Sequence, residues 1–66
     1  MITVHRNVAL IECAEELAME ELMAATPLPA HAIRRLSPRA VLVDPDYVDP
    51  VLQAMVQKGY TPRVES

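Results

Sequence analysis

The chain has 66 residues, with nine acidic and six basic side chains and a net charge of −3. This length fits a single domain over residues 1–66, and the core of so small a domain is marginal. One cysteine excludes an internal disulfide, two histidines without a cysteine pair give no zinc pattern, and one glycine excludes a phosphate-binding glycine loop. We therefore expect no metal and no cofactor, and extra stability must come from dense packing or from a partner.

Hydropathy and charge also limit the class of protein. No apolar run reaches the ~18 residues that span a membrane, and no secretory leader opens the chain, which predicts a cytoplasmic protein without membrane contact. Residues 1–33 hold five acids and one base, whereas residues 34–66 hold four acids and five bases. A free-standing nucleic-acid-binding domain is usually clearly basic, so the overall charge argues against that class.

The first half of the chain predicts a strand followed by a helix. Residues 8–13 form a short, almost unbroken apolar run with Val and Ile, which is typical of a buried strand. Ile2 and Val4 leave open whether this strand starts earlier or follows a separate arm. Residues 14–25 are rich in good helix formers, with apolar side chains three and four positions apart. This helix ends by Thr26, because a residue before proline is disfavoured in a helix.

The second half predicts a hairpin, a helix and a strand. Residues 32–43 form the hairpin around a Ser-Pro turn, with a short helical turn over residues 30–36 as the alternative. The next helix begins at Asp46 or Asp49, whose carboxylates suit its start, and closes at Gly59 in a left-handed conformation. Residues 60–65 form the last strand, with its proline at the beginning or on an edge of the sheet.

This order of elements predicts an α+β fold of the ferredoxin-like βαββαβ type. Two right-handed crossovers place both helices on one face of a four-stranded antiparallel sheet, with the first and third strands in the middle. Side chains alternate between the two faces of a strand, so four apolar residues are expected on the face without helices. They are Val8, Leu10, Ala40 and Leu42. An uncovered apolar face commonly marks an interface.

Arginines surround this predicted interface. Arg34, Arg35 and Arg39 lie in the predicted hairpin, and Arg6 and Arg63 complete the candidate contacts with phosphate or with an acidic partner. The alternative is that these arginines protect an edge strand from aggregation and pair with nearby acids. RNA-binding sheets stack bases on aromatic residues of their central strands, whereas both tyrosines of this chain lie elsewhere.

Catalysis has little support in the sequence. Cys13 follows a strand at the predicted start of a helix, where the helix dipole would lower its pKa, and His5 and His31 are possible bases. No third orienting group and no oxyanion motif accompanies them. We therefore predict that the chain is not an enzyme and has no catalytic residue.

Three stretches resemble the small helicase-associated domain found toward the C-terminus of bacterial proteins related to XPB-type helicases. They are "ALIEC" followed by a Leu-rich acidic helix, "IRRLSPRAVLV", and a helix closing in "KGYTPRV". The resemblance covers about residues 8–64. It implies an accessory role near DNA-handling proteins and transfers no catalytic residue. Cys13 and Ala14 stand where an acidic helix-capping pair is expected for the family.

Three hypotheses follow. The leading one is a non-catalytic interaction module, helicase-associated, that docks through its open sheet face onto a protein partner or a second copy. The second is direct nucleic-acid contact through the five arginines, with an affinity that falls steeply with salt. The third is a regulatory domain that binds a small molecule and is stabilised by it.

Overall fold

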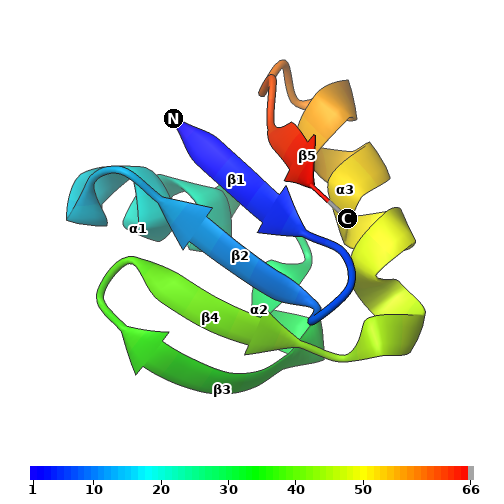
Figure 1. Cartoon of the computed structure of the whole chain (residues 1–66). Helices are drawn as coiled ribbons and strands as arrows, with labels where there is room; N and C mark the ends of the chain where they lie inside the picture. The colour runs from blue at the N-terminus through cyan, green and yellow to red at the C-terminus, as the bar shows by residue number, and fades with distance from the viewer. Residues whose placement is uncertain (66) are drawn as a thin grey trace.

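The computed structural model describes residues 1–65; residue 66, the last of the predicted domain, lies outside the described residues. The described chain is an α+β domain with one mixed sheet and three α-helices (Figure 1). In chain order the elements are β1 (Ile2–His5), β2 (Leu10–Cys13), α1 (Glu16–Ala25), α2 (Leu28–His31), β3 (Ala32–Ser37), β4 (Ala40–Val43), the 3-10 helix η1 (Pro45–Tyr47), α3 (Val48–Gln57) and β5 (Arg63–Glu65). No helix in this part of the chain is both long and apolar enough to cross a membrane.

The α+β class is confirmed, but the four-stranded antiparallel sheet is not. The sheet has five strands in the order β3-β4-β2-β1-β5, and β1 and β5 run parallel. The additional strand β1 pairs with β2 and lies between β2 and β5, so the last strand pairs with β1 instead of β2. From β2 onward the long elements follow the predicted order, and β2 and β4 are neighbours inside the sheet, as predicted.

The hairpin of β1 and β2 explains why the first strand was predicted in the wrong place. Residues 6–9 form a turn, so the strand starts at Leu10 rather than at Val8. Ala9 closes this turn with a φ of 53°, a left-handed conformation that residues with a Cβ rarely adopt. Asn7 favours a turn, but position 9 holds neither glycine nor asparagine, so the sequence does not indicate the left-handed residue that closes it. Val8 is consequently exposed in the turn and does not join the open face of the sheet.

The helices largely match their predicted limits. The first begins two residues late, at Glu16, and ends at Ala25, where Thr26 leaves the helical region before Pro27. The last long helix covers Val48–Gln57, and Gly59 follows with the expected positive φ of 93°. The side chain of Asp44 caps η1 by accepting a 3.0 Å hydrogen bond from the Asp46 backbone N–H, so neither of the predicted acids caps α3.

The hairpin predicted over residues 32–43 is present, with β3 and β4 joined by a turn at residues 38–39. The alternative helical turn is confined to α2, which ends before β3 begins. The final strand is shorter than predicted and covers only Arg63–Glu65.

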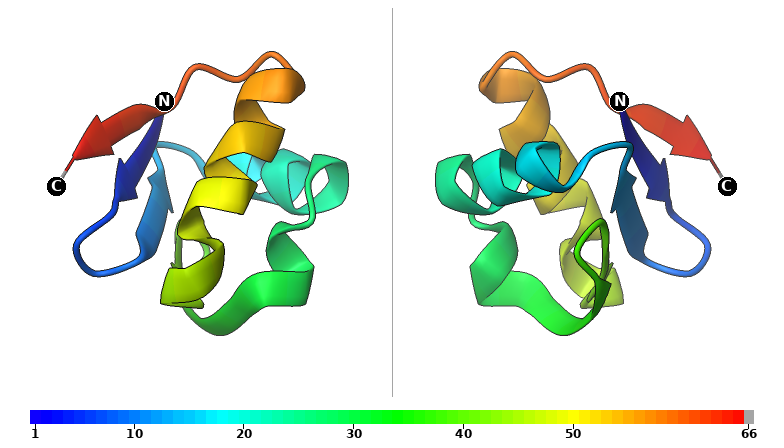
Figure 2. Two further views of the ribbon diagram at one scale, coloured as in Figure 1. Left: turned by 90° about the vertical axis from the view of Figure 1, so that its right-hand side faces the viewer. Right: turned by 90° about the vertical axis from the view of Figure 1, so that its left-hand side faces the viewer.

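The core lies between the helices and one face of the sheet. Figure 2 shows β1, β2 and β5 on one side of the molecule and the helices on the other. We call this the covered face. Every second residue of the central strands is buried there against apolar side chains of the helices. The sheet contributes Ile2, Val4, Ile11, Cys13, Val41 and Val43, and the helices contribute Met19, Leu22, Leu28, Val48, Val51 and Met55.

Candidate docking face

The other face of the sheet carries no helix, and in Figure 1 the strands lie in front of the helices. Strand register assigns side chains to this face, because residues directly opposite each other on neighbouring strands share one side. We call it the open face. Its residues are Thr3, His5, Leu10, Glu12, Arg34, Ser37, Ala40, Leu42, Arg63 and Glu65.

The register arranges these residues in two rows that cross all five strands. From β5 to β3, the first row is Glu65, His5, Leu10, Leu42 and Arg34. In the same direction, the second row is Arg63, Thr3, Glu12, Ala40 and Ser37. An apolar cluster therefore lies on β2 and β4, with Glu12 beside it on the middle strand, and further charged side chains lie at both edges.

Three of the four residues predicted for the interface meet in this apolar cluster. Leu10 and Leu42 are direct partners on β2 and β4, and Ala40 lies two residues before Leu42. All three are half-buried, because they cover one another without being covered by another element. Val8, the fourth predicted residue, lies outside the face in the β1–β2 turn.

A series of linked ionisable side chains extends from Glu12 on the middle strand to Arg63 on β5. His5 is central: its Nε2 lies 2.6 Å from Oε1 of Glu12, and its Nδ1 lies 3.5 Å from Oε1 of Glu65. Oε2 of Glu65 in turn lies 3.2 Å from Nε of Arg63. These groups are partly exposed, so their contacts order the side chains more than they stabilise the fold. Sequence patterns do not indicate these contacts, because the contacts depend on β1 lying between β2 and β5.

The five candidate arginines do not form one patch. Three of them pair with acids of the same chain: Arg6 lies 2.9 Å from Asp49 at the start of α3, Arg35 lies 2.8 Å from Glu20 on α1, and Arg63 pairs with Glu65. Exposed pairs of this kind agree with the structural alternative, in which arginines near an edge pair with neighbouring acids.

The hairpin arginines point to different surroundings. Arg35 is the register partner of the buried Val41 and so lies on the helix side, consistent with its contact to α1. Arg39, in the turn, donates to the Ala14 carbonyl at 3.3 Å. Arg34 is the register partner of Leu42 on the open face, and within residues 1–65 no acid lies within ion-pair distance of its guanidinium.

The possible nucleophile and bases are separated. Cys13 is the last residue of β2 and is buried on the covered face, where burial raises the pKa of its thiol. The prediction that a helix dipole lowers this pKa is wrong, because α1 begins three residues later. His5 lies on the open face, and His31 stacks on Tyr47 with ring centroids 4.0 Å apart.

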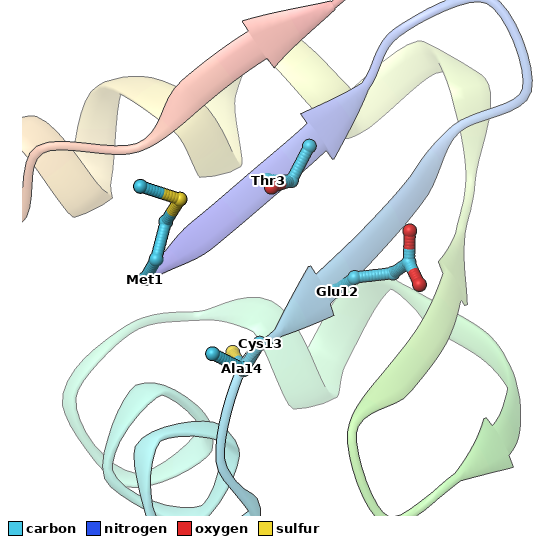
Figure 3. A pocket seen from close by; sticks show the side chains of 5 residues that line it. All are labelled: Met1, Thr3, Glu12, Cys13 and Ala14. Atoms are coloured by element: carbon cyan, nitrogen blue, oxygen red, sulfur yellow. The ribbon is translucent and has the colours of Figure 1, made fainter.

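Two open concavities lie near the amino end of β1. One, of about 200 Å³, is lined by Met1, Thr3, Glu12, Cys13 and Ala14 (Figure 3). The other, of about 280 Å³, is lined by Met1, Ile2, Ala18, Gly59, Tyr60 and Thr61. Both are smaller than the ~300–1,000 Å³ of typical small-molecule sites, which weakens the hypothesis of a ligand-binding regulatory domain.

Comparison of the chain with protein-family models, with curated proteins and with solved structures finds no match.

Proposed function

We propose that this chain is a non-catalytic interaction module that docks onto a protein through its open face. The observation that carries the proposal is the apolar centre formed by Leu10, Ala40 and Leu42 on a sheet face that no helix covers. Covering these side chains removes apolar surface from water, which is the main driving force of protein association.

The distribution of polar groups around this centre supports the same function. Protein interfaces commonly have an apolar core within a polar rim. On the open face, Arg63 and Glu65 lie at the β5 edge, Arg34 lies on β3 at the opposite edge, and Glu12 borders the apolar cluster on β2. Such a rim sets the orientation and the identity of a partner more than it raises affinity.

The cellular setting is the part of the proposal that depends on sequence alone. The likeness of "IRRLSPRAVLV" and "KGYTPRV" to the helicase-associated domain supports a cytoplasmic accessory role beside a DNA-handling protein. Direct nucleic-acid contact is less well supported, because three of the five arginines already pair with acids of the chain. A phosphate backbone would have to displace those acids or bind mainly through Arg34 and Arg39.

Site-specific photo-crosslinking tests the proposal. A benzophenone amino acid replaces Leu42 on the open face, and in a matched control it replaces Val56, which is 59% exposed on α3. Both chains are expressed in the native cells, irradiated and analysed for adducts, after circular dichroism has confirmed that each one folds.

The expected result is a protein adduct from position 42 and none from position 56. A DNA or RNA adduct from position 42 would contradict protein docking and support direct nucleic-acid contact instead. The absence of any adduct from a folded chain would contradict a docking role for the open face.

A further inference from the structure

We propose that the partner on the open face is a second copy of this chain, packed face to face around a two-fold axis that runs parallel to β2. This inference depends on the proposed function, because it names the occupant of the same surface. It is argued from strand order, from the distribution of charge and from the size of the face.

The strand order is suited to such a pairing because β2 is the middle strand of five. A two-fold axis above β2 places β2 over β2 of the second copy, β4 over its β1, and β3 over its β5. The first row of one copy then faces the first row of the other copy, with the order from β5 to β3 reversed. Leu10 meets Leu10 of the second copy, Leu42 meets its His5, and Arg34 meets its Glu65. In the second row, Ser37 meets Arg63 of the second copy, Ala40 meets its Thr3, and Glu12 meets its Glu12.

The charges at the two edges of the open face are complementary under this operation, whereas Glu12 on the central strand faces Glu12 of the second copy, and each of these carboxylates lies 2.6 Å from Nε2 of His5 in its own chain. Glu65 lies at the β5 edge beside Arg63, whereas Arg34 lies at the other edge and has no acid of residues 1–65 within ion-pair distance. Because a two-fold interface repeats each contact, Arg34 and Glu65 come together twice. Each copy therefore supplies the counter-ion that the other copy lacks.

The size of the face agrees with a weak to standard dimer. The molecule has principal extents of 25 × 25 × 22 Å and an accessible surface of 4120 Å². One face of a body with nearly equal extents is about a sixth of that surface, or roughly 700 Å², close to the ~800 Å² per partner of standard interfaces.

The edge strand β3 is a poorer route to self-association. It is six residues long, but its pairing with β4 shifts register between Ala32 and Arg34 and again between Arg35 and Ser37. Such irregularities, together with arginine side chains, hinder the addition of another strand to an edge. Association of two copies through β3 is therefore disfavoured relative to association through the face of the sheet.

A charge-swap experiment tests the dimer. Sedimentation velocity is run on the wild-type chain over roughly 1–500 µM, a range that covers interfaces of this size. Two variants, Arg34→Glu and Glu65→Arg, are measured alone and in an equimolar mixture. Arg35→Glu is the matched control, because it makes the same change at the adjacent position on the helix side of the sheet.

The wild type is expected to form a dimer, and each charge variant alone is expected to dimerise at least about tenfold more weakly, since like charges then face each other twice. In the mixed dimer both contacts join opposite charges again, so the mixture is expected to recover an affinity within about threefold of the wild type. The control is expected to dimerise like the wild type.

Three results would overturn the second copy as partner: a monomer over the whole range, charge variants that dimerise as well as the wild type, or a mixture that fails to recover affinity. A readout without charge variants is the purified chain carrying the crosslinker at position 42, which is expected to give an adduct of twice the chain mass. If the chain is a monomer but still crosslinks another protein from position 42 in cells, the dimer is excluded and the proposed docking function stands. A monomer without any adduct would retire both.

Discussion

On the covered face of the sheet, Val4, Ile11 and Val41 are each 1% exposed or less, whereas on the open face Thr3, Leu10 and Leu42 are only half-buried. Both sets belong to the same three strands and alternate along them. The helices make the difference, because they cover one side of the sheet and leave the other to solvent or to a partner. Stability is therefore expected to depend on the first set and recognition on the second.

The sharpest test of this difference uses two neighbours on β2. Ile11→Ala is expected to lower the free energy of unfolding by about 2–5 kcal/mol, because it leaves a cavity in the core. Leu10→Ala removes a similar side chain from a partly hydrated site and is expected to cost about 1 kcal/mol or less.

Urea unfolding followed by circular dichroism measures both variants, at a low micromolar concentration where a dimer adds little stability. The whole free energy of unfolding of a small domain is only about 5 kcal/mol at the low end, so Ile11→Ala would leave much of the chain unfolded. Equal losses at the two positions would refute the contrast between the faces.

A smaller effect is expected from the same chemical change at two threonines. Thr26 lies between α1 and α2 and is 8% exposed. Its Oγ1 donates a hydrogen bond to the Leu22 carbonyl at 2.8 Å and accepts one from the Leu28 backbone N–H at 3.3 Å. Thr26→Val keeps the shape and removes both hydrogen bonds, so we expect a loss of about 1–3 kcal/mol. Thr3→Val on the open face is expected to change stability by about 0.5 kcal/mol or less. Urea unfolding measures both variants. A larger loss of unfolding free energy for Thr3→Val than for Thr26→Val would contradict the assignment of stability to the covered side of the sheet.

The smallest effect appears only at alkaline pH and concerns Cys13. Burial raises the pKa of this thiol in the folded chain, so folding favours the neutral thiol. At pH values below the ordinary pKa of cysteine, the thiol is neutral in both states and this contribution to stability is fully present. Above about pH 8.5 the unfolded chain ionises first, and the free energy of unfolding falls as pH rises. Urea midpoints between about pH 7 and pH 10 are expected to fall more for the wild type than for Cys13→Ala. Parallel curves for the two chains would contradict the burial argument.

The parts of the fold that follow local rules were predictable. The stop of α1 at Thr26, the turn between β3 and β4 and the closing Gly59 of α3 each depend on one proline or glycine and its neighbours. Strand alternation likewise predicted the buried and open sides of β2 and β4. Leu10, Ala40 and Leu42 were identified on this basis before their neighbours in space were known.

The failures occur where contacts distant in sequence decide the structure. Ala9 adopts a left-handed φ without the glycine that usually indicates one, so residues 2–13 contain a hairpin that sequence patterns did not predict. The position of β5 beside β1 follows from that hairpin, and so does the chain of contacts from Arg63 through Glu65 and His5 to Glu12.

The sequence by itself determined the length and type of most elements, because helix stops, turns and face alternation are local properties of the backbone and its side chains. Only the tertiary structure decided that β1 lies between β2 and β5, that Arg35 pairs with α1 while Arg34 lies on the open face, and that Arg34 and Glu65 lie at opposite edges of that face. Strand order and register depend on the joint packing of all the elements against one core. No single segment of the 66-residue chain determines strand order or register.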